Sequence, residues 1–351
     1  MEVLVTGGSG FVGSHLVARL VRSGHRVRVL ARDRQRLARA LDPHGEVPVE
    51  VVEGDVLDAD AVREAVAGCD AAVHAANVYS LDVRRRVEMA RTNIEGTRTV
   101  LRETVEAGCD PVVHVSSMTA LLPARDPIGD DPPIGSNDET PYVGSKVRAE
   151  RVARRFQEVG APVAISYPGV VLGPHDPGPG EMRNILGGIL GGSHLFRLDR
   201  TAGFSVVDAR WLADAHAGLL EAGRGPRRVT MAGRHVTMAE FIELLRSLTG
   251  RRLPSVLPSP RWMSLASAQL ADVLRRTVGL RLPLTYEQSW LAYCWPPAED
   301  RHALDLAGPP PPLAETVGDA IRWLVSTGHL PSRHAGALTD ATGARAASAA
   351  S

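Results

Sequence analysis

A tyrosine and a lysine that stand four residues apart carry the groups needed for proton transfer near a substrate oxygen. Tyr142 and Lys146 lie in the run Thr-Pro-Tyr-Val-Gly-Ser-Lys at 140–146. On a helix this spacing puts both side chains on one face. A free tyrosine has a pKa of about 10, and a neighbouring cation stabilises the phenolate and lowers that value. The pair therefore predicts a tyrosine that acts as acid and base near neutral pH.

Two serines could hold the substrate oxygen beside this pair. Ser116 and Ser117 follow the apolar run 112–115, which is predicted to be a strand. Ligands bind at the carboxyl ends of strands in open α/β sheets, so a hydroxyl there can donate a hydrogen bond to the oxygen. The proline-rich loop 121–140 lies between the serines and Tyr142. It could wall a substrate pocket or be a solvated excursion on the surface.

A glycine-rich turn near the start of the chain could bind a dinucleotide. Gly7, Gly10 and Gly13 follow the strand-like run 3–5 and open a helix predicted over 11–22. Without Cβ atoms, these glycines allow a tight turn, a close approach to a pyrophosphate and close packing of helix on strand. The free N–H groups of a helix N-terminus also favour an anion. A plain glycine turn is the alternative, and the strand–turn–helix context favours the nucleotide site.

The end of the second predicted strand, 27–30, indicates which cofactor binds. A carboxylate there would bind the ribose hydroxyls of NAD, whereas this chain has Ala31, Arg32 and Asp33. Ala31 is small, and the planar guanidinium of Arg32 can hold a phosphate. We therefore expect NADP(H) in preference to NAD(H). In the alternative, Arg32 is a solvated loop residue and Asp33 holds the ribose.

These residues need elements that bring them to one edge of a sheet. Short apolar runs alternate with helical segments, which predicts a parallel sheet with helices on both faces. The expected fold class is α/β, a Rossmann-type doubly wound parallel sheet with a smaller C-terminal substrate-binding cap. The predicted strands are 3–5, 27–30, 49–52, 71–74, 112–115, 163–165 and 228–231.

The periodic pattern loosens after Pro168, which suggests where the domains divide. We expect an NAD(P)-binding domain over 1–172, to which 206–232 returns, and a cap made of 173–205 and 233–331. The last stretch, 332–351, consists mainly of Ala, Ser, Thr and Gly and has little to bury, so a disordered tail is expected. Helical patterns in the second half lie at 208–221, 237–249, 262–276 and 313–327.

The composition argues against several classes of function. In the 351 residues, 40 basic and 40 acidic side chains cancel, so no charge excess indicates nucleic acid as a partner. Three scattered cysteines and twelve histidines without ligand-like pairing lead us to expect no metal site and a reducing compartment. No apolar run approaches the roughly 20 residues of a membrane span. Strand-like residues begin at Glu2, which leaves no room for a signal peptide, and a cytoplasmic location is expected.

Several motifs together resemble those of the extended short-chain dehydrogenase/reductase family, the NAD-dependent epimerase/dehydratase group. The resemblance covers about residues 1–330. By the family pattern Ser117 is the catalytic serine, and Asn93 is a structural residue that supports the active site. The motifs, in chain order, are the fingerprint 6–13, His74-Ala75-Ala76, Asn93-Ile94-Glu95-Gly96-Thr97, Val115-Ser116-Ser117, the pair Tyr142 and Lys146, the segment 167–174, and Val206-Val207-Asp208.

The resemblance and the patterns above imply an NAD(P)-dependent oxidoreductase with assignable site residues. The expected catalytic residues are Ser117, Tyr142 and Lys146, with Asn93 in support. The expected cofactor-binding residues are Gly7, Gly10, Phe11, Val12, Gly13, Arg32, Asp55, Val56, Ala75, Ala76, Ser116, Tyr142, Lys146, Pro168 and Val171. Tyr79, Met118 and Arg183 are candidates for substrate contact.

The layout looks most like the dihydroflavonol-reductase and hydroxysteroid-dehydrogenase branch, which acts on carbonyls of apolar molecules. Sugar-nucleotide members usually carry a Gly-rich, Arg-containing stretch before the Val-x-Asp segment, and 195–204 does not match it. We expect a small-molecule substrate, and the resemblance suggests a homodimer through long helices. Two alternatives stay open: a nucleotide-sugar epimerase or dehydratase with tightly bound NAD, and a non-catalytic regulator that senses NADP.

Overall fold

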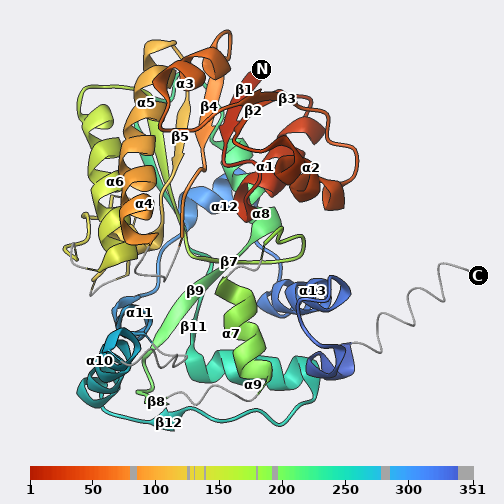
Figure 1. Ribbon diagram of the computed structural model, residues 1–351, viewed down its shortest axis with the longest axis vertical. Helices are drawn as coiled ribbons and strands as arrows, with labels where there is room; N and C mark the ends of the chain where they lie inside the picture. The colour runs from red at the N-terminus through yellow and green to blue at the C-terminus, as the bar shows by residue number, and fades with distance from the viewer. Residues whose placement is uncertain are drawn as a thin grey trace, which may run out of the picture.

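A seven-stranded parallel sheet contains every strand predicted above (Figure 1). The computed structural model describes residues 1–79, 85–124, 127–129, 131–137, 140–178, 181–191, 197–277 and 285–338, without the side chains of 181–184, 197 and 276. The strand order is β10-β6-β5-β4-β1-β2-β3. The strands are β1 (Glu2–Thr6), β2 (Arg26–Ala31), β3 (Glu50–Glu53), β4 (Ala71–His74), β5 (Val112–Val115), β6 (Val163–Pro168) and β10 (Arg227–Met231).

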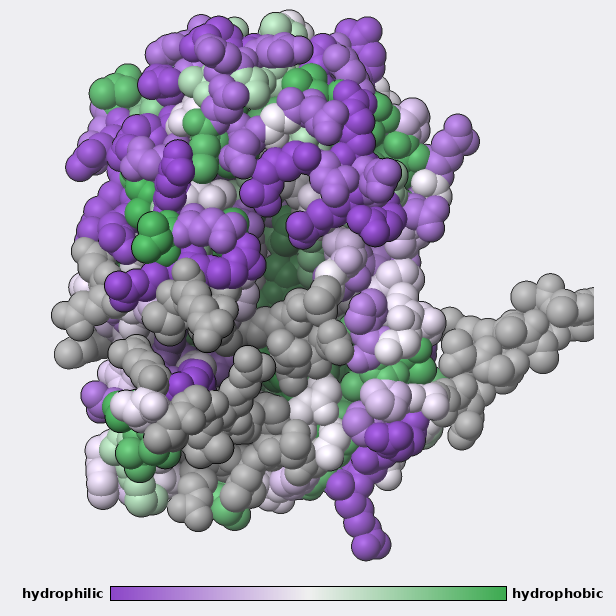
Figure 2. Space-filling model, viewed as in Figure 1, coloured by the Kyte–Doolittle hydropathy of each residue, from purple (hydrophilic) through white to green (hydrophobic). Residues whose placement is uncertain are grey.

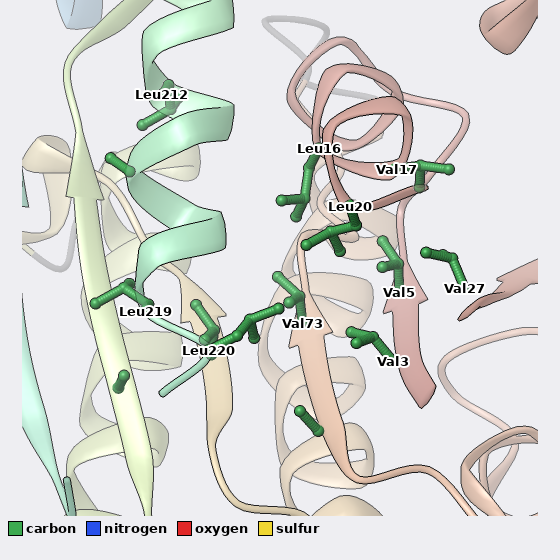
Figure 3. Packing of buried hydrophobic residues seen from close by; sticks show 14 of the residues in the cluster. Val3, Val5, Leu16, Val17, Leu20, Val27, Val73, Leu212, Leu219 and Leu220 are labelled. Carbon is green, nitrogen blue, oxygen red and sulfur yellow. The ribbon is translucent and has the colours of Figure 1, made fainter. Parts of the chain in front are cut away.

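Helices cover both faces of this sheet, so each apolar run is buried between two layers. In β1, Val3 and Val5 pack with Leu16 and Leu20 of the first helix (Figure 3), whereas Leu4 between them belongs to the core on the opposite face. One face carries α1 (Phe11–Arg22), α2 (Arg34–Leu41), α8 (Ala209–Gly218) and α12 (Arg301–Ala307). The other carries α3 (Ala59–Val66), α4 (Arg86–Arg91), α5 (Thr97–Glu106) and α6 (Pro141–Glu158).

A smaller part of the molecule lies below the large sheet in Figure 1 and has its own core. Its mixed sheet has the order β11-β9-β7, with β7 (Val170–Leu172) parallel to β9 (Gly203–Asp208) and β11 (Arg234–Thr237) antiparallel to β9. A two-stranded sheet pairs β8 (Arg197–Leu198) with β12 (Leu257–Pro258). The helices of this part are α7 (Glu181–Leu190), α9 (Met238–Thr249), α10 (Arg261–Thr277), α11 (Tyr286–Cys294) and α13 (Leu313–Ser326).

The predicted fold class is confirmed, and two details of the predicted organisation differ. The segment 206–232 contributes to both sheets, because β9 pairs within the small sheet and β10 pairs with β6 in the large one. Residues Ser332–Leu338 are ordered, contrary to the expected tail. They form two 3-10 turns whose Ala335 and Leu338 are buried in the core of the small part. Residues 339–351 lie outside the described residues.

The glycine-rich turn joins the end of β1 to the start of α1 at very close range. Gly7 has φ +79°, and a Cβ there would lie 2.5 Å from the backbone of Ala75 and Ala76 after β4. A Cβ on Gly13 would lie 2.1 Å from the carbonyl oxygen of Gly7. Both positions therefore require glycine, and together they hold the helix N-terminus against the carboxyl ends of β1 and β4.

Among the helices that the structure describes, none is long and apolar enough to cross a membrane.

Candidate active site

A pocket lies at the carboxyl ends of β1, β2, β3 and β4. The order of strands reverses direction between β1 and β4, which is where open α/β sheets bind ligands. The first turn of α1 faces it without an acidic side chain, so its N–H groups can receive a pyrophosphate. The lining residues are Gly7, Ser9, Gly10, Leu30, Ala31, Arg32, Arg36, Gly54, Asp55, Val56, Ala75, Ala76, Asn77, Val78 and Thr92.

Some of the predicted cofactor-binding residues line this pocket and others do not. Gly7, Gly10, Arg32, Asp55, Val56, Ala75 and Ala76 line it. Gly13 packs on Gly7, and the Phe11 ring packs edge-on against His15 at 5.2 Å between ring centroids. Val12 and Val171 pack against the core that contains Val3, Val5 and Leu16, and Pro168 is buried in β6. Phe11, Val12, Pro168 and Val171, together with Gly13, therefore pack around the turn and the strands and lie outside the lining of this pocket.

The end of β2 presents a basic side chain to the pocket. The Asp33 carboxylate caps α2 by accepting a hydrogen bond of 3.0 Å from the Arg36 N–H, and Asp33 does not line the pocket. Arg32 does line it, and its guanidinium lies 3.5 Å from the Asp55 carboxylate with 58% of its side chain exposed. A loose, exposed pair of this kind holds its partners weakly, so Arg32 can turn to a phosphate.

The helix that carries the tyrosine–lysine pair is capped by a carboxylate from far along the chain. Glu287 of α11 accepts hydrogen bonds from the N–H groups of Tyr142 (3.1 Å) and Val143 (2.9 Å) in the first turn of α6. Thr140, the residue before the helix, makes no capping bond with its own side chain. Glu287 therefore fixes the turn that bears Tyr142. Sequence reasoning missed it because no local pattern indicates a cap from another element.

Tyr142 is half-buried and touches a residue that the sequence placed on the substrate side. Its ring packs edge-on against Tyr79, with ring centroids 4.6 Å apart. Tyr79 directly follows Asn77 and Val78, which line the nucleotide pocket. The pocket thus leads toward the tyrosine, although Tyr142, Lys146 and Ser117 are outside its lining.

Lys146, one turn after Tyr142, is the chain's one lysine among 40 basic residues. Its side chain is buried, and this burial lowers its pKa from 10.5 to about 8, against the raising effect of the Glu150 carboxylate. Arginine cannot lose its proton in a protein, whereas a buried lysine can. A chain that otherwise uses arginine therefore carries lysine at this buried position, where the side chain can lose its proton. The sequence alone shows this signal, because Lys146 is its one lysine.

Two buried histidines near Lys146 stay neutral. Burial, with a smaller effect from Lys146, lowers the pKa of His74 to about 3 and that of His114 far below its usual value. The His74 ring is held between the hydroxyls of Thr6 (2.8 Å) and Thr97 (3.2 Å). At neutral pH neither histidine therefore adds a positive charge beside the Lys146 ammonium group.

Asn93 connects the pocket to the tyrosine helix. It lies in the π-helical turn η3 (Thr92–Gly96) and is buried. Its amide accepts from the Val78 N–H (2.9 Å) and donates to the Val78 carbonyl (3.0 Å) and to the Ser145 hydroxyl (3.0 Å). The Ser145 hydroxyl in turn donates to the Tyr142 carbonyl at 2.7 Å. Asn93 is thus placed as a positioning residue, and its amide groups are occupied by the fold.

Ser117 keeps a proton to donate, whereas Ser116 does not. Ser117 begins the 3-10 turn η4 (Met118–Leu121) and accepts from the N–H (3.2 Å) and hydroxyl (2.9 Å) of Thr119. Both bonds use lone pairs of its oxygen. The Ser116 hydroxyl donates its proton to the fully buried Glu150 at 2.8 Å, and the cofactor contact expected of Ser116 stays a prediction. Glu150 also accepts from Arg154 (2.7 Å) and from the Tyr167 hydroxyl (2.6 Å).

The two remaining substrate candidates stay predictions. Met118 is fully buried in the core that contains Leu4 and Leu121. The side chain of Arg183, on α7, lies outside the described residues.

The loop 121–140 is tied to the body of the protein in the parts that the structure describes. Ile128 and the segment 297–299 exchange backbone hydrogen bonds of 3.0 and 2.8 Å, and Arg154 donates to the Pro132 carbonyl at 2.8 Å. These contacts anchor the loop, whereas Pro127, Asp131 and Pro133 are exposed, and both alternatives for the loop stay predictions. Residues 125, 126, 130, 138 and 139 lie outside the described residues.

Comparison with known proteins decides which family has this architecture. The model of the NAD dependent epimerase/dehydratase family matches residues 3–218. The chain belongs to this family. It is an enzyme of the extended short-chain dehydrogenase/reductase type, an NAD(P)-dependent oxidoreductase.

Similar proteins span from about three quarters of the chain to nearly all of it. It is 27% identical to a putative dihydroflavonol 4-reductase from Synechocystis sp., over 94% of this chain and 96% of the relative. It is 29% identical to a 3-beta-hydroxysteroid dehydrogenase from Mycolicibacterium neoaurum, over 74% and 73% of the two chains. The crystal structure of gox2253 has a TM-score of 0.75 and 26% identity, over 94% of this chain and 99% of that chain.

The buried lysine gives a direct prediction for proton binding. Labelling with [ε-13C]lysine should give one resonance, because the chain has one lysine, and Lys146 should titrate at a pKa of about 8 by NMR. Glu150→Gln should move this pKa lower, since it removes the negative charge that raises it. Glu158→Gln, at the exposed end of α6, is the matched control and should leave the pKa unchanged. Titration near 10.4, as for an exposed lysine, would contradict the burial.

Proposed function

We propose that this protein is an NADP(H)-preferring oxidoreductase that interconverts an alcohol and a ketone or aldehyde on a small apolar substrate. The observation that carries the proposal is the buried Lys146, one helical turn from the half-buried Tyr142. A protein that only bound the nucleotide would not need a desolvated cation beside a phenol. The glycine turn fits the cofactor, because Cβ atoms at Gly7 and Gly13 would fill the space that lets the backbone approach it.

Tyr142, Lys146 and Ser117 each have a separate role in the proposed reaction. A bound nicotinamide would supply a hydride to the substrate carbon, or accept one in the reverse direction. In reduction, Tyr142 donates its phenol proton to the substrate oxygen, and Lys146 stabilises the phenolate that forms. Ser117 donates a hydrogen bond to the same oxygen as negative charge develops on it. Asn93 and Glu287 hold the turn that bears Tyr142.

The preference for NADP(H) rests on Arg32. The end of β2 offers this guanidinium to the pocket, while the neighbouring carboxylate of Asp33 is occupied as a helix cap. A 2′-phosphate would meet a cation there and no free carboxylate from β2. Asp55 is the residue that opposes this reading, because its carboxylate also lines the pocket and pairs with Arg32.

The apolar substrate is inferred from the surroundings of Tyr142 and from the relatives. Figure 2 shows hydrophobic surface in the hollow between the large-sheet part and the small-sheet part. Tyr79 adds an aromatic wall beside Tyr142. The dihydroflavonol reductase and the hydroxysteroid dehydrogenase carry names of apolar ring compounds. We propose that 173–205 and 233–331 cover such a substrate. The expected homodimer and the cytoplasmic location stay predictions.

Replacing the acid should remove turnover and spare the cofactor. In Tyr142→Phe, carbonyl reduction across a panel assayed with NADPH and NADH should fall at least about 100-fold. NADPH binding, followed by its fluorescence, should stay within about two-fold of wild type, because a single ring oxygen outside the nucleotide pocket is lost. Tyr286→Phe, another half-buried tyrosine, is the control.

The same preparation separates the rival functions. Unchanged turnover in Tyr142→Phe would refute the assignment. A nicotinamide retained through purification would indicate an epimerase or dehydratase with bound NAD. NADPH binding without hydride transfer to any member of the panel would indicate a regulator that senses the cofactor.

Two neighbouring arginines test the cofactor preference. Arg32→Ala should weaken NADPH binding about 10- to 100-fold, the effect of losing hydrogen bonds to a charged group, and leave NADH binding unchanged. Arg34→Ala is the matched control, because Arg34 bonds the Glu53 carboxylate (3.2 Å) and the Val51 carbonyl (2.7 Å) outside the pocket. Equal losses of both cofactors in Arg32→Ala, or no loss of either, would show that Arg32 does not read the phosphate.

A further inference from the structure

Three histidines that are far apart in the sequence meet beside the start of α1. His15 lies on α1, His44 ends the short 3-10 turn η1 (Asp42–His44), and His175 follows β7. One nitrogen from each ring lies within 4.8 Å of the other two. We propose that His15, His44 and His175 form a binding site for a transition-metal ion that prefers imidazole nitrogen, with Zn²⁺ the expected ion. The expectation of no metal site followed from sequence spacing, which could not show this convergence.

The hydrogen bonding of His15 prepares it as a ligand. Its Nδ1 lies 3.1 Å from the Phe11 carbonyl oxygen, which can only accept a hydrogen bond. Nδ1 therefore carries the proton and Nε2 keeps its lone pair. A backbone carbonyl behind the ring is the usual outer partner of a metal-bound histidine. The Nε2 atoms of His15 and His44 are buried and have no hydrogen-bond partner among the described residues. A bound ion would satisfy both.

His175 is held at the cluster by an unusual backbone conformation. It has φ +62°, and it is the one non-glycine residue with positive φ among the described residues. Its ring packs edge-on against Trp323 of α13 and lies 4.9 Å from the His44 ring, centroid to centroid. Sparsely populated conformations persist where the surroundings hold them, and ligand clamps are a common place. The left-handed backbone directs this ring to the other two.

The surrounding charges are compatible with a cation. Asp208 lies near enough to favour positive charge at His15, and Arg210 is paired with Asp208. Arg22, which donates to the His44 carbonyl at 2.8 Å, and Arg210, which acts on His175, are cations that oppose an ion here. Three neutral ligands leave a fourth position for water or a small anion.

The distances between the ring nitrogens of the three histidines set how far the rings must move to bind one ion. Zinc–nitrogen bonds of about 2.0–2.1 Å place tetrahedral ligand atoms about 3.4 Å apart. The three rings must therefore close by about an ångström from their present positions. The ion would then join α1, which packs on the large sheet, to the segment after β7, which reaches Trp323 in the small part. A structural ion at this junction should raise the melting temperature of the whole chain.

The test uses the full-length, tag-free chain, stripped with a chelator and titrated with ZnCl2 and CoCl2. Wild type should bind one Zn²⁺ per chain, gain melting temperature, and give the visible absorption of a four-coordinate nitrogen site with Co²⁺. His44→Gln and His175→Asn should each lower the affinity for Zn²⁺ at least about 100-fold. Removing a group that only hydrogen-bonds to a metal ligand costs up to about this much, and these variants remove a ligand itself. Asparagine tolerates the left-handed backbone at 175, so this variant keeps the turn.

His235→Gln is the matched control, because His235 on β11 is half-buried and its Nδ1 also has no partner among the described residues. It should bind Zn²⁺ as wild type does. If a metal-free variant binds NADPH and melts as the metal-free wild type does, the variant is folded. One folded variant, either His44→Gln or His175→Asn, is enough to test the site. The proposal is overturned if wild type binds no Zn²⁺, or if His44→Gln or His175→Asn binds it as tightly as His235→Gln. The three rings would then serve only as packing.

Discussion

A buried ammonium group one helical turn from a phenol is the constraint on which the site depends. Water normally stabilises the charge of a lysine, and its removal at Lys146 lowers the pKa to about 8. The same loss of water makes the remaining charge act more strongly on its neighbours. The other basic residues of the chain are arginines, which are charged at any working pH. The chain therefore places its one lysine one helical turn from Tyr142, where the proposed proton transfer would use a titratable cation.

The rest of the site serves to hold α6 in place around this charge. Glu287 caps the first turn, and Asn93 links Val78 at the nucleotide pocket to Ser145 in the second. Glu150, one turn after Lys146, supplies the opposing charge and is itself satisfied by Ser116, Arg154 and Tyr167. A buried carboxylate without such partners would cost several kcal/mol. The Ser116 hydroxyl is part of this support.

The sequence predicted the features that depend on local pattern. Short runs of three or four residues indicated the strands, and the glycine spacing indicated the turn, because burial on both faces and lack of Cβ atoms leave a clear local signal. Contacts between distant segments gave no such signal. Glu287 caps a helix from another element, and Met118 turns into the core because a 3-10 turn follows Ser117. The histidine cluster required three segments to converge, and the ordered turn at Ser332–Leu338 depends on a core built elsewhere.

The most direct measurement is the ionisation of Tyr142 in the NADP⁺ complex. Labelling with [ζ-13C]tyrosine gives five resonances, and the one missing in Tyr142→Phe identifies the residue. The account predicts that Tyr142 titrates well below the value of about 10 for free tyrosine and that Lys146→Met raises its pKa by about one unit or more. A Tyr142 that titrates near 10 both with and without the lysine would contradict it.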